Sequence, residues 1–320
     1  MARSKNSKIR AIDLFSGAGG SSWGARQAGV EVVAAFDLWK LAGLSHVQNF
    51  PGSNFYHGRL EDANLGALAR KLGKVDLILA SPECTNHSPA KGNRPRSEES
   101  KDTAFQVARF AKKLKPRWLV IENVVSMRGW SRYMEFKAEL ESLGYNVREQ
   151  VLNSAHFGVP QSRRRLFLVC DRDQMPEKTP VLVGREKHAR TVVDLNGTYR
   201  WTPLERAGRA QATLERAARG MKEIGESKPF LLVYYGSDHA GGWQKLSRPL
   251  RTITTVDRFA IVKPSSKGHV MRMLQVPELQ LAMGMDGMEF KHGTRREQIK
   301  MIGNAVCPPV MKAVIENLLK

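Results

Sequence analysis

Short apolar runs alternate with segments of helical periodicity in the first half of this 320-residue chain. The apolar runs span residues 9–15, 30–36, 75–80, 118–121, 147–152 and 166–170. The segments that suit helices span residues 24–28, 60–72, 103–114 and 133–143. Near-continuous apolar strands separated by helices are typical of a mostly parallel sheet that is covered on both faces. The pattern therefore predicts a doubly wound α/β domain, like a Rossmann fold.

The alternation stops after Asp171, where prolines, arginines and glycines become frequent. Short strand-like pieces at 230–235 and 259–262 replace the earlier rhythm. We therefore expect a second, smaller domain at 173–270 and a connection at 271–295. The apolar, helically spaced residues at 309–319 are expected to pack back on the first domain, which then consists of 1–172 and 296–320.

The charge of the chain points to a polyanionic partner. It has 51 Lys and Arg against 31 Asp and Glu, a net charge of +20. Most of the excess lies in three stretches, 1–10, 85–120 and 161–219. Such a charge creates a field that attracts polyanions, so nucleic acid is the first partner to consider, ahead of membrane headgroups. A merely basic, soluble surface is the alternative.

Cysteine usage and hydropathy exclude several classes of protein. The three cysteines cannot form a complete disulfide set, and none has the spacing of metal ligands. The N-terminus is basic but lacks the apolar run of a signal peptide, and no stretch approaches the roughly 18 apolar residues of a membrane span. We expect a cytoplasmic protein with no membrane attachment and no metal.

The first apolar run ends in the sequence DLFSGAGG, residues 13–20. Glycines at the end of a first strand let the backbone approach a ligand closely. The GxGxxG of dinucleotide sites is absent, and Asp13 would repel a pyrophosphate but attract an amine. This favours S-adenosylmethionine over NAD, with an ordinary strand-to-helix turn as the alternative. Asp37 ends the second run, where an acid can accept ribose hydroxyls, although a surface turn acid is equally common.

Two side chains with catalytic potential follow the next strands. Cys84 begins a polar loop just beyond the run at 75–80, a place that suits an exposed nucleophile, although a buried free cysteine is the common alternative. Glu122 directly follows the run at 118–121. It can therefore lie on the opposite side of a substrate ring from Cys84. Strand alternation places Arg163 and Arg165 on one face, where they suit a phosphate or a carbonyl oxygen; a solvated basic strand is more usual.

Taken in order, the motifs DLFSGAGG, the cysteine loop, ENV, QSRRR, RPLRTITT and GNAV resemble those of the cytosine-5 DNA methyltransferases. The resemblance runs from Asp13 to about Val310 and leaves only the variable basic segment unmatched. It implies an enzyme that methylates C5 of cytosine in a specific duplex DNA sequence, with 173–270 as the target-recognition domain. A cytosine-5 methyltransferase of RNA, such as tRNA, and a catalytically impaired DNA-binding relative are the alternatives.

The resemblance also implies roles for individual residues. It implies that the S-adenosylmethionine site includes Asp13, Phe15, Ser16, Gly17, Gly19, Asp37, Asn304 and Ala305. It implies that the catalytic residues are Cys84, Glu122, Arg163 and Arg165. Expected contacts to DNA are Lys91, Arg94, Arg96, Arg163, Arg185 and Arg200. Residues 248–255, RPLRTITT, are expected mainly to support the recognition domain.

In this chemistry a thiolate adds to C6 and makes C5 nucleophilic. Cys84 would supply the thiolate, Glu122 would bind N3 and the exocyclic amine, and Arg165 would bind O2. The target base must first rotate out of the duplex. The base that removes the C5 proton is not identified. We expect a monomer close to the nucleoid, with a restriction endonuclease as a possible cognate partner.

The chain departs from the family pattern at two places. Glu83 occupies the position of the proline that normally precedes the catalytic cysteine. Arg59 stands where the family usually has an acid near the adenine amino group, with Glu61 and Asp62 as the nearest substitutes. These departures put the pKa of Cys84 and the adenine contact in question.

Overall fold

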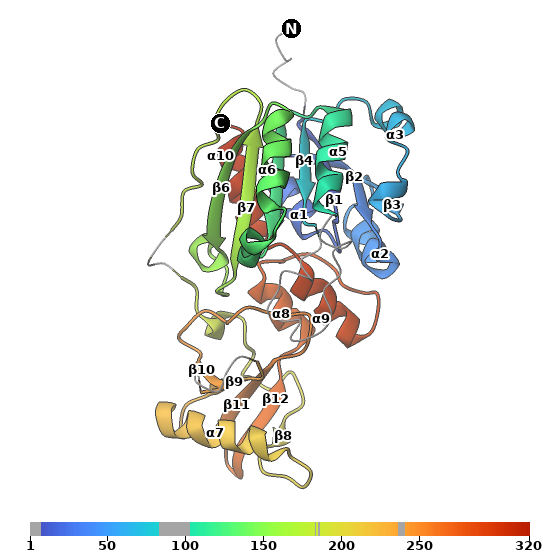
Figure 1. Ribbon diagram of the computed structural model, residues 1–320. Coiled ribbons are helices and arrows are strands. Elements are labelled where there is room, and N and C mark those ends of the chain that lie inside the picture. The colour runs from blue at the N-terminus through green and yellow to red at the C-terminus, as the bar shows by residue number, and fades with distance from the viewer. Residues whose placement is uncertain (1–7, 83–102, 183, 185, 236–240) are drawn as a thin grey trace.

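The computed structural model describes residues 8–82, 103–182, 184, 186–235 and 241–320. Two sheets organise this part of the chain, one above the other in Figure 1. The larger sheet has seven strands in the order β3-β2-β1-β4-β5-β7-β6. Its strands are β1 (Arg10–Leu14), β2 (Glu31–Asp37), β3 (Asn54–His57), β4 (Leu77–Ala80), β5 (Trp118–Asn123), β6 (Asn146–Asn153) and β7 (Arg164–Asp171).

Strands β3, β2, β1, β4 and β5 are parallel, whereas β7 is antiparallel to both β5 and β6. Every residue of β4 and β5 is buried, as expected for strands covered on both faces. Because β1, β2, β4 and β5 run in the same direction, their carboxyl ends meet at one edge of the sheet. This edge carries the ends of the motifs identified in the sequence, and the predicted doubly wound α/β fold is confirmed.

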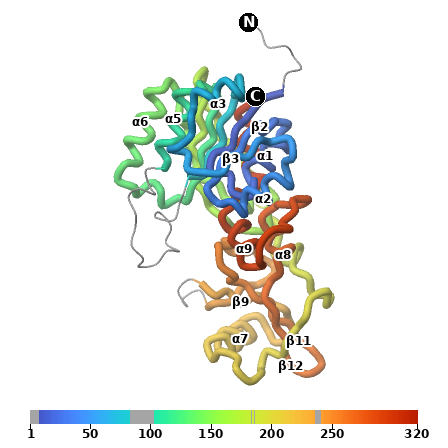
Figure 2. The backbone as a smooth tube through the Cα atoms, turned by 90° about the vertical axis from the view of Figure 1, so that its right-hand side faces the viewer, coloured from blue at the N-terminus to red at the C-terminus, as the bar shows by residue number. Residues whose placement is uncertain are grey.

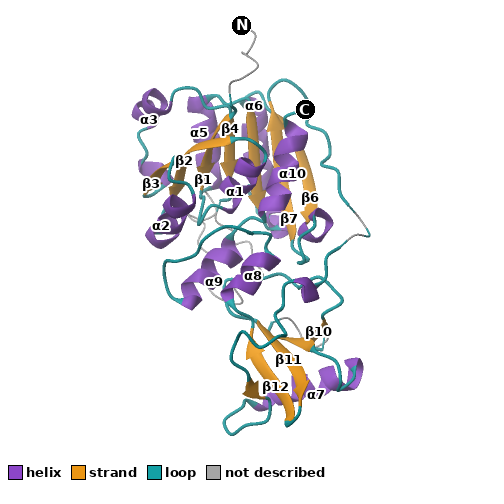
Figure 3. Cartoon of the chain, turned by 180° about the vertical axis from the view of Figure 1, so that it is seen from behind, coloured by secondary structure: helices purple, strands orange, loops and turns teal. Residues whose placement is uncertain are grey.

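Helices cover both faces of the large sheet in a three-layer arrangement, seen from the front in Figure 1 and from behind in Figure 3. One layer packs on the core that contains Ile12, Ile78 and Leu119, and it consists of α3 (Leu65–Leu72), α5 (Ala104–Leu114) and α6 (Tyr133–Ser142). The other layer packs on the core that contains Ala11 and Leu79, and it consists of α1 (Gly20–Gln27), α2 (Lys40–Asn49) and α10 (Pro308–Leu318). Short 3-10 helices lie at Leu60–Asp62, Val125–Gly129, Ser154–Phe157 and Ala189–Thr191.

The second sheet is antiparallel and has the order β10-β9-β11-β12-β8. Its strands are β8 (Thr202–Pro203), β9 (Phe230–Val233), β10 (Trp243–Lys245), β11 (Phe259–Ser265) and β12 (Gly268–Met273). Helix α7 (Gln211–Ile224) packs against one face through Ala217, which meets Phe230 and Leu232 in a small apolar cluster. Helices α8 (Val276–Ala282) and α9 (Arg295–Asn304) lie between the two sheets (Figure 2).

Several elements differ from the prediction. Strand β3 and helix α2 were not predicted, because β3 is a partly exposed edge strand and α2 has no clear apolar stripe. Helix α1 begins earlier than the predicted 24–28, since its first residues are glycine and serine that are buried by close packing. Helices α7, α8 and α9 were also not predicted. No described helix is long and apolar enough to cross a membrane.

Candidate active site

The turn that follows β1, residues 15–20, is called the glycine turn here, and its backbone is unusual. Phe15, Gly17 and Gly19 have φ values of 57°, 52° and 98°. Residues other than glycine rarely adopt such φ values. Those that do, such as Phe15 here, are found most often at active sites and ligand-binding sites. The Ser16 N–H donates to the Phe36 carbonyl over 3.0 Å and holds the turn against β2.

Asp37 joins the glycine turn to the end of β2. Its Oδ2 accepts the Gly17 N–H and its Oδ1 accepts the Trp39 N–H, both over 2.7 Å. A carboxylate oxygen has a second lone pair, so Asp37 can still accept hydrogen bonds from hydroxyl groups. The adjacent Leu38 presents an apolar side chain that is 57% exposed. The turn, Asp37 and Leu38 thus form one platform at the edge of the sheet.

The GNAV segment packs directly on the glycine turn, although it lies near the other end of the sequence. Asn304 is the last residue of α9 and is exposed, and Ala305 follows it. A Cβ at Gly20 would collide with the Val306 carbonyl oxygen and lie 3.2 Å from the Cβ of Ala305. Glycine at position 20 therefore permits the approach that brings Asn304 and Ala305 beside the predicted cofactor residues.

Asp13 is placed differently from the expectation that it attracts an amine directly. Its side chain is fully buried beneath the glycine turn, and its Oδ2 accepts the Ser22 hydroxyl over 2.6 Å. Burial raises the pKa of Asp13 to about 7, and the charge of Asp37 adds to this effect, while hydrogen bonds from Ser22 oppose it. Because the side chain of Asp13 is buried, it cannot contact a ligand that binds on the exposed side of the glycine turn. Asp13 instead supports the turn from the interior.

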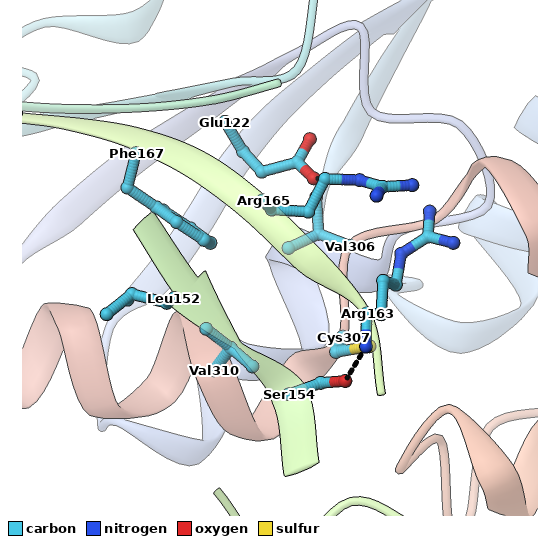
Figure 4. A pocket seen from close by; sticks show the side chains of 9 residues that line it. All are labelled: Glu122, Leu152, Ser154, Arg163, Arg165, Phe167, Val306, Cys307 and Val310. Carbon is cyan, nitrogen blue, oxygen red and sulfur yellow. Dashed lines mark hydrogen bonds and ion pairs between the residues drawn. The ribbon is translucent and has the colours of Figure 1, made fainter. Parts of the chain in front are cut away.

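Glu122 and Arg165 form an ion pair, with Glu122 buried and Arg165 partly buried, at the ends of β5 and β7. Arg165 Nε lies 3.1 Å from Glu122 Oε1, and the two side chains are 18% and 8% exposed. Figure 4 shows the pair beside a pocket that Ser154 and Cys307 also line. Burial raises the pKa of Glu122, while Arg165 and Arg163 oppose the shift. A carboxyl whose pKa is raised in this way holds a proton more readily than an exposed one, which suits general acid–base chemistry.

Cys84 lies outside the described residues, but the chain can be followed to Pro82. The side-chain amide of Asn123 donates to the Pro82 carbonyl over 3.2 Å. Asn123 is the residue next to Glu122, so this contact places Pro82, the last described residue before Cys84, at the end of β5. Glu83, the first departure from the family pattern, also lies outside the described residues.

Arg163 is placed differently from the expectation that it contacts DNA. Its side chain is buried, and its guanidinium donates to the carbonyls of Ile253, Gly303 and Ala305 over 2.9, 2.9 and 3.1 Å. A guanidinium engaged with three carbonyls in the interior cannot reach a phosphate in solution. Arg163 therefore ties β7 to the GNAV segment, and the assignment of Arg163 as a DNA contact is corrected.

The RPLRTITT segment runs alongside the residues before β7. The Ser162 N–H donates to the Leu250 carbonyl over 2.7 Å, and the Leu250 N–H donates to the Pro160 carbonyl over 2.8 Å. Gln161 Oε1 accepts the Ile253 N–H over 2.8 Å. The RPLRTITT segment, which precedes β11 in the sequence, is therefore held against the large sheet next to β7. The QSRRR motif indicated Gln161 but not this role.

The predicted DNA contacts are mostly beyond what the structure describes. Lys91, Arg94, Arg96 and Arg185 lie outside the described residues. Arg200 is exposed in the segment before β8, at one edge of the small sheet.

Arg59 has a half-exposed side chain, 3.9 Å from a carboxylate oxygen of Glu61. It lines a pocket of about 440 Å³ with His57, Asp62 and Lys71. The position expected to hold an acid therefore carries an arginine, with Lys71 and Asp62 around the same pocket and the acid Glu61 beside the arginine.

Sequence reasoning missed two residues that contact the predicted site. Ser22 and His46 lie with Asp13 under the glycine turn. His46 belongs to α2, a helix that the sequence did not predict, so no pattern connected it with Asp13. Among the described residues no group of three or more His, Cys, Asp or Glu side chains could hold a metal ion.

Comparison with known proteins agrees with the motifs. The family model for C-5 cytosine-specific DNA methylase matches residues 9–320. The Type II methyltransferase M.HgiDI of Herpetosiphon aurantiacus is 30% identical over 309 residues, which cover 93% of this chain and 90% of that protein. The Type II methyltransferase M1.HphI of Haemophilus parahaemolyticus is 28% identical over 331 residues, which cover 97% and 86%.

Solved structures show the same fold. Spodoptera frugiperda DNMT2 has a TM-score of 0.71 at 16% identity, over 98% of this chain and 100% of that chain. The S. pombe Dnmt2 methyltransferase has a TM-score of 0.68 at 16% identity, over 98% of each chain. At this identity the likeness concerns the fold alone. The family match over nearly the whole chain shows that this protein belongs to the C-5 cytosine-specific DNA methylases and is a DNA cytosine-5 methyltransferase.

Proposed function

We propose that this methyltransferase acts on a cytosine turned out of duplex DNA, through a covalent bond between Cys84 and C6 of the base. The observation that carries the proposal is the Glu122–Arg165 pair, which lies beside Pro82, the last described residue before Cys84. A carboxyl with a raised pKa next to a guanidinium suits a neutral, polar ring that gains charge during the reaction.

The platform around the glycine turn fits S-adenosylmethionine, which supplies the methyl group as a sulfonium. A Cβ at Gly17 would meet nothing within 4 Å, so the space beside the turn is open. Asp37 would accept the ribose hydroxyls, Phe15 and Leu38 would contact the adenine, and Asn304 and Ala305 would border the site. Asp13, Ser16 and Gly19 would hold the turn in shape, because all three are buried.

Each catalytic side chain has a separate task in the proposed reaction. The Cys84 thiolate would attack C6 and electron density would move to C5, which would take the methyl carbon as the methyl–sulfur bond breaks and the sulfonium leaves as a neutral thioether. Glu122 holds N3 and the exocyclic amine, and offsets the charge that develops in the ring. Arg165 keeps Glu122 in place and binds O2. A base then removes the C5 proton and Cys84 leaves, which restores the aromatic ring.

The positive charge is proposed to hold the duplex over this site. Rotating the base out costs a few kcal/mol of stacking and pairing, which contacts to phosphates must offset. We assign those contacts to Lys91, Arg94, Arg96, Arg185 and Arg200. We also propose that residues 1–172 and 296–320 form the catalytic and cofactor-binding domain, that 173–270 form the target-recognition domain and that 271–295 connect the two.

The curated relatives named above are Type II methyltransferases. We therefore propose that the protein works in a restriction-modification system, as a monomer in the cytoplasm near the nucleoid, with a cognate restriction endonuclease.

Tritiated S-adenosylmethionine offered with separate DNA and RNA pools tests the proposal. We expect label in DNA, and none with the Cys84→Ser variant, which should still bind DNA. Label in RNA alone would favour an RNA substrate, and substantial turnover by Cys84→Ser would remove Cys84 from the mechanism. Bisulfite sequencing of DNA from cells that express the protein would then give the recognition sequence.

A further inference from the structure

Three polar side chains form a buried chain of contacts beneath the glycine turn. Ser22 Oγ on α1 lies 2.6 Å from Asp13 Oδ2 on β1 and 3.2 Å from His46 Nε2 on α2. All three side chains are fully buried. A Cβ at Gly19 would come within 3.0 Å of the His46 ring, so the chain of contacts touches the turn directly.

The hydroxyl of Ser22 has one proton, so protonation of Asp13 on Oδ2 changes the direction of both contacts. If Asp13 is ionised, Ser22 donates to Asp13 and accepts from His46 Nε2–H. If Asp13 is protonated, it donates to Ser22, which then donates to an unprotonated Nε2. Protonation of Asp13 on Oδ2 is therefore coupled to the tautomer of His46.

Among the described residues of the elements packed around Asp13, no cation compensates an ionised Asp13. Burial lowers the pKa of His46 to about 4, so this ring is neutral at neutral pH. The ionisable neighbour on β2 is Asp37, which repels a second negative charge. The basic residue of α1, Arg26, stacks on Trp23 with its guanidinium 3.8 Å from the ring centroid. The neighbouring strand β4 presents Leu79, which carries no charge.

Two polar atoms of this chain of contacts have no hydrogen-bond partner among the described residues. They are Asp13 Oδ1 and His46 Nδ1. An ionised Asp13 needs positive charge nearby, and the proposed cofactor brings an ammonium and a sulfonium to the other side of the turn.

We propose that Asp13, Ser22 and His46 form a proton-linked support of the glycine turn, in which binding of the cationic cofactor favours the ionised form of Asp13. Ser22 and His46 are positioning residues, since they act through Asp13 and the turn. This inference rests on the proposed cofactor site. It makes cofactor affinity depend on pH, because the protonated form must lose a proton when the cofactor binds.

The size of the effect follows from the pKa of Asp13. With a pKa of about 7 before binding, Asp13 is mostly protonated at pH 6 and mostly ionised at pH 8. The Kd for S-adenosylmethionine should therefore be about five- to tenfold weaker at pH 6 than at pH 8. At pH 7 binding should release up to about half a proton.

Titration calorimetry of the full chain with S-adenosylmethionine, in two buffers with different ionisation enthalpies, measures the proton release. We expect release by the wild type and almost none by Asp13→Asn, whose side chain cannot ionise. Ser22→Ala should move the pH midpoint upward, since the ionised carboxylate loses a hydrogen bond, and Ser22→Thr should restore it. Ser45→Ala is the matched control. Ser45, on α2, is buried like Ser22, but its hydroxyl donates to Met301 Sδ and not to Asp13.

The outcomes separate this inference from the proposed function. Binding that is the same at pH 6 and pH 8, or proton release that persists in Asp13→Asn, would overturn the inference and leave the cofactor site intact. Failure of the wild type to bind S-adenosylmethionine at any pH would overturn both. A midpoint shift in Ser45→Ala equal to that in Ser22→Ala would show that the effect is general to buried serines of this region.

Discussion

Replacing Arg163 with methionine tests whether this side chain holds the site together from inside. Methionine keeps an unbranched apolar stem and removes the guanidinium that donates to Ile253, Gly303 and Ala305. A hydrogen bond from a charged donor contributes about 1.5–3 kcal/mol, so three bonds set the upper range. Because the carbonyls can relax and the contributions are not additive, we expect a loss of about 3–5 kcal/mol in the free energy of unfolding.

Urea unfolding followed by circular dichroism measures this loss. Arg164→Met is the matched control, since Arg164 is the exposed neighbour, and its effect should stay within about 0.5 kcal/mol. Cofactor affinity should fall with Arg163→Met, because Ala305 adjoins the glycine turn. If Arg163→Met instead lost only DNA affinity, with the unfolding free energy and cofactor affinity retained, Arg163 would be a DNA contact and the reasoning would be refuted.

Glu122→Gln should slow single-turnover methyl transfer by roughly 10² to 10⁴, and an unchanged rate in rapid-quench measurements would contradict its role. Asp13 has a raised pKa, so the folded state binds its proton more tightly and stability falls as the pH rises from about 4 to about 7. Asp13→Asn should remove this fall, up to about 4 kcal/mol, when urea unfolding is repeated across that range. Gly20→Ala should weaken cofactor binding measured by calorimetry, since its Cβ would collide with the Val306 carbonyl; equal affinity would show that the turn can move. Glu278→Gln should destabilise the protein by about 3–5 kcal/mol in thermal or urea unfolding, because it leaves buried Arg272 without its carboxylate partner at 2.7 Å; a change below 1 kcal/mol would contradict this.

The positions of the chemical groups at the sheet edge could be predicted from local pattern alone. Parallel strands with the same direction bring their ends together, so the end of β1, Asp37 and Glu122 were expected at one edge. Strand alternation also placed Arg163, which immediately precedes β7, and Arg165 on the same side. The structure brings both guanidiniums close enough to affect the pKa of Glu122.

The surroundings of those groups could not be predicted in the same way. Arg163 and Arg165 come from equivalent positions in the alternation, yet one holds three backbone carbonyls and the other pairs with Glu122. The carbonyls come from Ile253 and from the end of α9, about 90 to 140 residues away in the sequence. The hydrophobic periodicity of a strand shows which residues share a face, but it does not show which distant segment of the chain packs on that face.

The amino-acid sequence by itself determined the alternation of strands and helices in residues 1–172, apart from β3 and α2, and also the residue types at the strand ends and the family. These features depend on hydrophobic periodicity and on side-chain chemistry, which are local properties of the chain. Only the tertiary structure decided which polar groups face a ligand and which support the site from within. Asp13 and Arg163 belong to the second group, because α1, α2 and the GNAV segment bury them. Burial removes these side chains from water, and it thereby changes their pKa values, their partners and their function.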